Sequence, residues 1–157
     1  MRIYIDCEFN GYAGELISMA LVKEDGEEWY RILHEPRVWN EWVHENVLPV
    51  LGGEAIGWDN FTAELKSFLD ACDGCEFIAD HPADLKHLSE QMDIISSGND
   101  FRILIECTMT LLRGSPDIKS EIPHNALSDA RALRDWHQST LKPEPETPAA
   151  ERLRASA

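Results

Sequence analysis

The first 33 residues carry the pattern that most constrains the fold. Residues 2–9 alternate with a period of two, which is the period of a β-strand. One side of this segment carries Ile3, Ile5, Cys7 and Phe9, and the other carries Tyr4, Asp6 and Glu8. An apolar stretch at residues 15–22 and a further strand pattern at residues 28–33 follow, joined by an Asp25-Gly26 turn. The sequence therefore predicts three antiparallel strands in a meander.

Helical and strand patterns alternate after the meander. Helices are expected at about residues 37–47, 59–71, 82–92, 108–112 and 125–140, and strands at residues 75–79 and 101–105. A meander followed by alternating strands and helices is typical of a mixed sheet with helices on its faces. We therefore expect an α/β domain with a mixed five-stranded sheet flanked by helices, the layout of ribonuclease H-like folds.

The end of the chain differs in composition from the rest. Residues 142–157 contain three prolines and no aromatic residue, which is typical of a flexible segment. The 157 residues are therefore expected to form one domain at residues 1–141 and a flexible tail at residues 142–157.

The charge balance narrows the classes of function. Asp and Glu number 29 against 14 Lys and Arg, which gives a formal net charge of −15. This excludes a nucleic-acid binder that works through a broad basic surface, but not an enzyme that meets phosphates through metal ions. No apolar run approaches the roughly 18 residues of a membrane-spanning helix, and Asp6 and Glu8 come too early for a signal peptide. We therefore expect a soluble, cytoplasmic protein without a membrane partner.

Two acidic residues lie on the first expected strand. Asp6 and Glu8 share one face of it, and two like charges there raise each other's pKa unless a cation lies between them. A divalent cation is the usual solution, although an acidic chain also produces such a pair by chance.

Asp129 lies on the apolar stripe of the last expected helix, with Ala126, Ala130 and Leu133. A buried carboxylate has to pair, take up a proton or bind a metal ion. Its partner is therefore either a metal ion or an arginine, with Arg102 and Arg131 as the candidates for an ion pair.

Two further residues complete a pattern. His124 precedes Asp129 by five residues and is either a surface histidine or a proton acceptor. Asp84 lies in the first turn of the helix that begins near Pro82, where acidic residues are favoured for electrostatic reasons and Asp80 could act as the cap. In a ribonuclease H-like sheet, however, all four carboxylates can converge around two divalent cations about 3.5–4 Å apart.

This order of residues resembles the DEDDh superfamily of 3′→5′ exonucleases. The segments DCEFNG, ELISMALV, WVHENVLPVL, IADHPADLKHL and PHNALSDARAL are most similar to the small RNase AS-like, adenylate-preferring exoribonucleases of bacteria and phages. The resemblance covers about residues 1–140. Two departures are Phe9-Asn10-Gly11, where many members have Thr-Gly soon after the first Glu, and Asp80, where many have Asn.

The resemblance implies roles for individual residues. Asp6, Glu8 and Asp129 would hold one Mg²⁺ or Mn²⁺ ion, Asp6 and Asp84 a second, and His124 would accept the proton of the attacking water. The substrate would be the 3′ end of single-stranded RNA and the product a nucleoside 5′-monophosphate. Relatives of this kind also suggest a homodimer.

Contacts to the substrate are expected from Phe9, Asn10, Gly11 and His81. Phe9 either stacks on a base or packs in the core, and Gly11 allows a sugar to approach the backbone. Trp39, Trp42 and Trp58 are candidates for lining the substrate groove, although packing of the helix is favoured for Trp42.

Two other functions remain open. One is a 3′→5′ exonuclease that acts on single-stranded DNA, because discrimination rests on contacts to the 2′-hydroxyl. The other is a non-catalytic acidic interaction protein, such as a DNA mimic. The mimic needs no metal ion, whereas a nuclease site gains stability when Mg²⁺ or Mn²⁺ is added.

Overall fold

The computed structural model describes residues 1–11, 14–33, 40–72, 74–97, 106–112 and 118–141. Its six strands are β1 (Arg2–Phe9), β2 (Leu16–Lys23), β3 (Glu28–Leu33), β4 (Ala55–Ile56), β5 (Cys75–Ala79) and β6 (Cys107–Leu111). They form one mixed sheet in the order β4-β3-β2-β1-β5-β6. The β1-β2 and β2-β3 pairs are antiparallel, and the β1-β5, β5-β6 and β3-β4 pairs are parallel.

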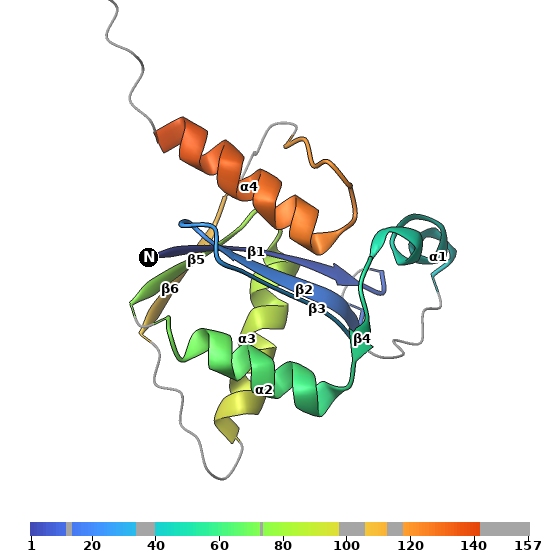
Figure 1. Cartoon of the computed structure of the whole chain (residues 1–157), viewed down its shortest axis with the longest axis horizontal. Helices are drawn as coiled ribbons and strands as arrows, with labels where there is room; N and C mark the ends of the chain where they lie inside the picture. Colours follow the sequence, from blue (N-terminus) through green and yellow to red (C-terminus); the bar gives the residue numbers. More distant parts are fainter. Residues whose placement is uncertain (12–13, 34–39, 73, 98–105, 113–117, 142–157) are drawn as a thin grey trace, which may run out of the picture.

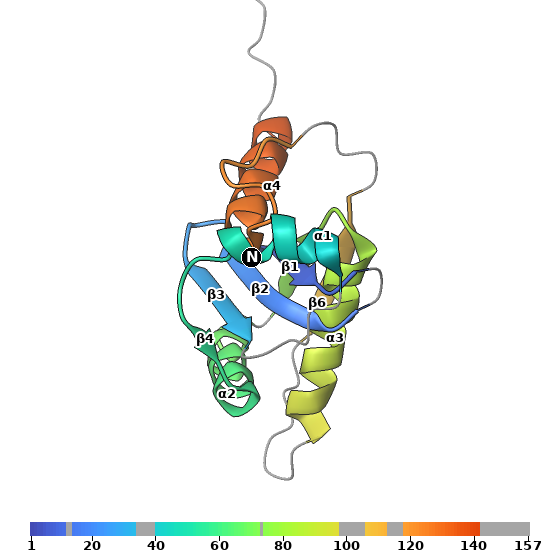
Figure 2. The same ribbon diagram turned by 90° about the vertical axis from the view of Figure 1, so that its right-hand side faces the viewer.

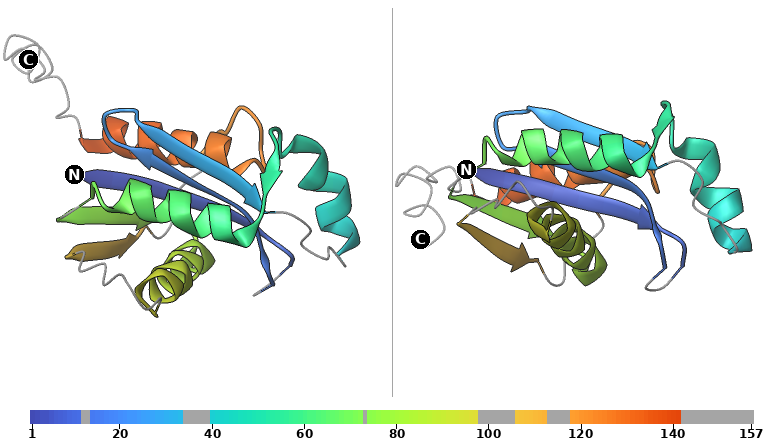
Figure 3. Two further views of the ribbon diagram at one scale, coloured as in Figure 1. Left: turned by 60° about the horizontal axis from the view of Figure 1, so that its bottom comes forward. Right: turned by 90° about the horizontal axis from the view of Figure 1, so that it is seen from below.

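Helices cover both faces of the sheet and one of its ends. They are α1 (Glu41–Asn46), the short 3₁₀ helix η1 (Leu48–Val50), α2 (Trp58–Leu69), α3 (Pro82–Ser97) and α4 (Ala126–Leu141). Figure 1 shows α4 on one face of the sheet and α2 and α3 on the other. The views from below show α2 and α3 crossing the same face (Figure 3). Helix α1 lies beyond the end of β1 in Figure 1 and therefore in front of that strand in Figure 2, which is viewed from that side.

The alternation in β1 decides which side chains enter which layer. Ile3, Ile5 and Cys7 are buried in the core that includes Phe61 and Leu65 of α2. Tyr4 points to the opposite face, where it packs with Leu133 of α4. Asp6 and Glu8 share the side of Tyr4, so the period of two places both carboxylates on the α4 face of the sheet.

Small side chains let α4 lie close to the strands. Ala126 and Ala130 are fully buried against Ala20 and Val22 of β2. Leu133 continues this stripe, and its burial contributes about 1.5–3 kcal/mol. The close approach brings the first turn of α4, which contains Asp129, to the carboxyl end of β1.

Apolar contacts with strands β2 and β3 position α1. Val43 and Val47 pack against Ile17 and Ile32. The helix begins at Asn40, whose side-chain oxygen accepts a hydrogen bond from the Trp42 backbone N–H. Val43 therefore faces the sheet, while Trp42 projects from a different side of the helix and is half-exposed.

Most of the expected elements are present. The meander, the Asp25-Gly26 turn and the strand at residues 75–79 are confirmed, as are the helices that begin near Pro82 and Asn125. The helix near Pro82 is longer than expected and runs to Ser97. The sheet is mixed and flanked by helices, and the architecture is compatible with a ribonuclease H-like fold.

Two expectations about the sheet need correction. The helix expected at residues 108–112 is wrong, because Cys107–Leu111 pairs with β5 as strand β6. Thr108 and Thr110 are β-branched, and such side chains favour a strand once a parallel neighbour is available. The sheet also has a sixth strand, β4, because two residues pair with the end of β3. The strand expected at residues 101–105 and the tail at 142–157 lie outside the described residues.

In the part of the chain that the structure describes, no helix has the length and apolar character needed to cross a bilayer.

Candidate active site

The carboxyl ends of β1 and β5 bring most of the acidic side chains together. The two strands are parallel neighbours, so their ends open on the same edge of the sheet, where ligands bind in open α/β sheets. Asp6 and Glu8 lie in the last half of β1, Asp80 directly follows β5, and Asp84 lies in the first turn of α3. Asp129 reaches the same point from α4.

These five carboxylates form two groups that share one member. One carboxylate oxygen each of Asp6, Glu8 and Asp129 lie within 4.8 Å of one another, and the same holds for Asp6, Asp80 and Asp84. Asp6 belongs to both groups. The structure therefore brings together all four acidic residues expected from the sequence and adds Asp80.

Burial and mutual repulsion make these side chains hard to ionise. Burial raises the pKa of Glu8 to about 8, and the charge of Asp129 adds to the effect. Burial also raises the pKa of Asp84 to about 8, with Asp80 as the main neighbouring charge. For Asp6, burial and then the surrounding carboxylates, Asp84 first, raise the pKa well above its ordinary value. A positive charge between them would favour the ionised forms.

Asp84 is held rigidly but is left with one bare oxygen. Its side chain is 1% exposed, and its Oδ1 accepts a hydrogen bond of 3.2 Å from the Cys7 backbone N–H. Its Oδ2 is buried with no hydrogen-bond partner. A buried polar atom without a partner costs about 1–3 kcal/mol, so this oxygen is suited to a ligand.

Asp129 and His124 are tied to each other through the backbone. The His124 N–H donates a hydrogen bond of 3.0 Å to Asp129 Oδ2. Burial raises the pKa of Asp129, while its hydrogen bonds oppose the shift. Arg131 is not its partner, because the Arg131 guanidinium makes two hydrogen bonds to Glu28. Arg102, the other arginine considered, lies outside the described residues.

The loop before α4 holds His124 in an uncommon conformation. Its φ is +67°, in the left-handed region that costs energy for a residue with a side chain. The Asn125 side chain secures the loop, since its Nδ2 donates to the carbonyls of Val50 and Leu51 and its Oδ1 accepts from Ser128 N–H. This fixes the backbone at His124 while its ring remains exposed.

Two cavities meet at His124. The first, of about 240 Å³, is lined by Asp6, Asp80, Ile118, Ser120, Pro123, His124 and Asp129. The second, of about 330 Å³, is lined by Cys7, Glu8, Phe9, Gly11, Trp42, Val43, His81 and His124. Neither includes a Lys or Arg among the described residues. The site is thus strongly anionic and borders an aromatic cavity.

Aromatic rings form two walls of the second cavity. Phe9 stacks on His81 with ring centroids 5.8 Å apart, and it also contacts the buried His87. On the other wall, the Trp42 ring meets His124 edge-on at 4.8 Å. Trp42 therefore lines the cavity, which is one of the two roles considered for it, although packing of the helix was the favoured one. Trp39 lies outside the described residues, and Trp58 packs edge-on against Phe61.

Gly11 and Asn10 shape the end of β1. Gly11 lines the aromatic cavity and has φ +72°, and a Cβ there would lie 3.0 Å from Asn40 Nδ2. This position therefore suits glycine on two counts. Asn10 instead makes the turn towards β2, where its N–H donates to the Glu15 carbonyl. Of the four expected substrate contacts, three thus line the cavity.

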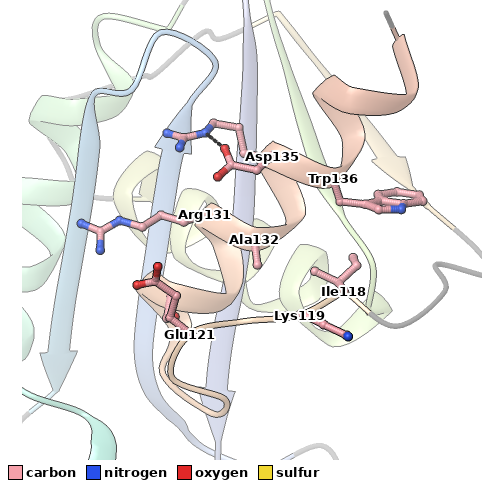
Figure 4. Close-up of a pocket in the computed structure, with 9 residues that line it drawn as sticks. Ile118, Lys119, Glu121, Arg131, Ala132, Asp135 and Trp136 are labelled. Atoms are coloured by element: carbon pink, nitrogen blue, oxygen red, sulfur yellow. Dashed lines mark hydrogen bonds and ion pairs between the residues drawn. The ribbon is translucent and has the colours of Figure 1, made fainter. Parts of the chain in front are cut away.

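A separate cavity of about 480 Å³ lies on the outer side of α4 and contains Ala132 (Figure 4). Arg131 and Trp136 project from different sides of the helix there. Its two arginines are already paired, Arg131 with Glu28 and Arg134 with Asp135. Among the described residues, the clustered carboxylates lie around Asp6 and not in this cavity.

The donor set around Asp6 fits a hard divalent cation. All of the ligand atoms in the two groups are carboxylate oxygens, the ligands that Mg²⁺ and Mn²⁺ prefer. The bare Oδ2 of Asp84 and the raised pKa values show that the described residues do not neutralise this charge themselves.

Sequence reasoning missed Asp80 as a member of the site, because an acidic residue before a helix is usually its cap. In the structure the His81 ring takes that role, since its Nδ1 accepts a hydrogen bond from Ala83 N–H. The signal that could have revealed Asp80 is its place directly after the strand expected at residues 75–79, because ligands bind at the carboxyl ends of strands in such sheets.

No protein-family model matches the chain. The chain is similar to two 3′-5′ exoribonucleases of Mycobacterium tuberculosis, MT2234.1 of strain CDC 1551 and Rv2179c of strain H37Rv. With each it shares 44% identity over 55 residues, which cover 32% of this chain and 33% of the relative. The match therefore spans about a third of the length of either relative.

Proposed function

We propose that this chain is a metal-dependent 3′→5′ exoribonuclease of the DEDDh, RNase AS-like kind, which releases nucleoside 5′-monophosphates from single-stranded RNA. The observation that carries the proposal is the pair of carboxylate groups that share Asp6. The partial similarity to two proteins named 3′-5′ exoribonucleases supports the 3′→5′ direction of digestion and the choice of RNA as the substrate.

The two carboxylate groups are the proposed sites of two Mg²⁺ or Mn²⁺ ions. Asp6, Glu8 and Asp129 would hold one, and Asp6 with Asp84 would hold the other. Bound there, divalent cations neutralise a phosphodiester and stabilise the charge that develops on its leaving 3′ oxygen. In a chain with a net charge of −15, they also allow a polyanion to approach.

His124 is the proposed general base. Its ring borders the cavity that Asp6 and Asp129 line, and it is exposed. A neutral imidazole has one ring nitrogen with a free lone pair, which can accept a proton from a water that attacks the phosphorus. The fixed loop around His124 presents the ring to this cavity without further rearrangement.

The aromatic cavity is the proposed seat of the 3′-terminal nucleotide. It adjoins Glu8 and His124, so a base held there places its phosphate at the carboxylates. Phe9 and Trp42 offer ring faces or edges for a base, and such contacts are worth about 1–3 kcal/mol per base.

Digestion of 5′-labelled single-stranded RNA and DNA of the same sequence tests the proposal. With Mn²⁺ or Mg²⁺, we expect the RNA to shorten stepwise from its 3′ end, to release 5′-monophosphates and to outpace the DNA. EDTA and Asp6→Asn should each abolish the ladder. The matched control Asp59→Asn removes an exposed acidic charge at the start of α2 and should leave it intact.

Other outcomes would redirect the assignment. Faster digestion of DNA would support the single-stranded DNA exonuclease. Intact RNA and DNA with every metal, from protein whose circular dichroism shows it to be folded, would contradict the catalytic proposal and favour the acidic interaction protein.

A further inference from the structure

We propose that Asp80 is a further acidic ligand of the cation held by Asp6 and Asp84, so that the centre contains five carboxylates. The inference rests on the proposed function, because it concerns the cations of the same site.

The first observation is the position of the side chain. One oxygen each of Asp6, Asp80 and Asp84 lie within 4.8 Å of one another. Asp80 directly follows strand β5 and also lines the cavity of about 240 Å³ that contains Asp6 and His124. Its exposure leaves it open to an ion that arrives from solvent, whereas Asp84 forms the buried floor of the same group.

The second observation concerns Asp84. The residue is only 1% exposed, and its Oδ2 is buried without a hydrogen-bond partner. The Cys7 N–H fixes the other oxygen, so the carboxylate is oriented rather than free to turn. An oriented, buried and unpartnered oxygen beside two further carboxylates is a place for a cation rather than for another acidic group.

The third observation is that Asp80 has no structural task in the described part of the chain. Its carboxylate makes no hydrogen bond or ion pair with another described residue. The His81 ring accepts the Ala83 N–H at the start of α3, and the His81 carbonyl accepts the Asp84 N–H. A residue that neither caps the helix nor pairs with a cation only adds repulsion to the group.

The charge balance makes this testable without any substrate. Without a cation, the carboxylate of Asp80 lies beside those of Asp6 and Asp84, with one oxygen of each within 4.8 Å of the others, and like charges at this distance repel one another. Replacement of Asp80 by Asn should therefore stabilise the metal-free protein. If Asp80 is a ligand, the same replacement should weaken cation binding, so the effect on stability changes sign when metal is added. If Asp80 only capped the helix, Asp80→Asn would instead lower the stability of the protein or leave it unchanged, both without metal and with it.

The experiment is a titration of the metal-free full chain with Mn²⁺ alone, followed by electron paramagnetic resonance of the unbound ion, with melting curves in EDTA and in Mn²⁺. For Asp80→Asn we expect one dissociation constant to rise by at least about tenfold, the lower range for loss of a supporting residue at a metal site. In EDTA the melting temperature of Asp80→Asn should not be lower than that of the wild type. The increase in melting temperature on adding Mn²⁺ should be smaller for Asp80→Asn than for the wild type. Asp59→Asn is the matched control and should behave as the wild type.

Comparison with Asp6→Asn separates this inference from the proposed function. If Asp6→Asn loses Mn²⁺ binding while Asp80→Asn binds as the wild type does, the role of Asp80 is refuted and the metal centre stands. If the wild type itself binds no Mn²⁺, both proposals fail. A melting temperature of Asp80→Asn that falls equally in EDTA and in Mn²⁺ would identify a structural residue and overturn the inference.

Discussion

At the scale of single residues, the account depends on carboxylates that hold protons when no cation is present. Burial raises the pKa of Glu8 and of Asp84 to about 8, against about 4 in an unfolded chain. Between these values the folded state binds more protons than the unfolded state, so the free energy of unfolding decreases as the pH rises. Cation binding removes this penalty, because it replaces the protons.

We therefore expect the melting temperature of the metal-free protein to fall between pH 5.5 and pH 8.5, and to fall less when Mg²⁺ is added. Glu8→Gln should reduce the metal-free decline by at least about 2–4 °C, the shift that roughly 1 kcal/mol produces in a domain of this size. Differential scanning calorimetry in EDTA measures this. An unchanged decline in Glu8→Gln would show that the Glu8 carboxyl is not the group that titrates.

His124 can be tested separately from the metal ligands. Asn tolerates the left-handed conformation found at φ +67°, so His124→Asn removes the base with little backbone strain. We expect kcat to fall by about 10²–10⁴-fold, with the melting temperature and the Mn²⁺ affinity unchanged. A kcat within threefold of the wild type would exclude His124 as the base.

At the scale of elements, the distance between α4 and the sheet determines where Asp129 lies. Ala126 and Ala130 permit the close approach of α4 to β2. This approach also determines the positions of Asp129, in the first turn of the helix, and of His124 just before it. The helix also carries its own control, because Ala132 faces the open cavity on the other side (Figure 4).

Enlarging a residue beneath α4 should therefore act on both stability and activity. Ala130→Leu is expected to lower the free energy of unfolding by about 1–3 kcal/mol and to weaken Mn²⁺ binding, because it displaces the first turn of the helix. Ala132→Leu, the same change on the open side, should have little effect on either. Chemical denaturation measures the free energy of unfolding of both variants, and Mn²⁺ titration measures their affinity for the ion. Equal changes in Ala130→Leu and Ala132→Leu would contradict the packing argument.

Helix α1 offers a test of the aromatic cavity. Trp42 and Trp58 are each about half-exposed, but only Trp42 belongs to the described lining of that cavity. Trp42→Ala should raise KM for a short oligoribonucleotide by roughly 5–150-fold, which corresponds to about 1–3 kcal/mol of stacking. Trp58→Ala should leave KM unchanged. Equal KM values for the two variants would remove Trp42 from the substrate site.

Local patterns in the sequence were sufficient for the elements with a strong period. The alternation of Ile3, Ile5 and Cys7 correctly predicts β1, and the apolar stripe around Asp129 correctly predicts which side of α4 is buried. The strand at Cys107–Leu111 was missed because its identity depends on pairing with β5, a contact remote in sequence. Trp42 and Asp80 were misjudged for the same reason, since only the assembled sheet edge shows what each side chain faces.

At the scale of the whole molecule, the proposed function has to reconcile a net charge of −15 with a polyanionic substrate. The described residues bring five carboxylates to one edge of the sheet, with no Lys or Arg among those that line the adjoining cavities. Without cations the site therefore repels nucleic acid, and with them its local field is inverted. Substrate binding should accordingly require the same ions as catalysis.

The most direct test of this central claim is an anomalous difference map from crystals grown with Mn²⁺. The account predicts two peaks that share the Asp6 carboxylate. One should also contact Glu8 and Asp129, and the other Asp84 and Asp80. A map without any peak at Asp6, from crystals in which the carboxylates are ordered, would contradict the metal centre and with it the proposed nuclease.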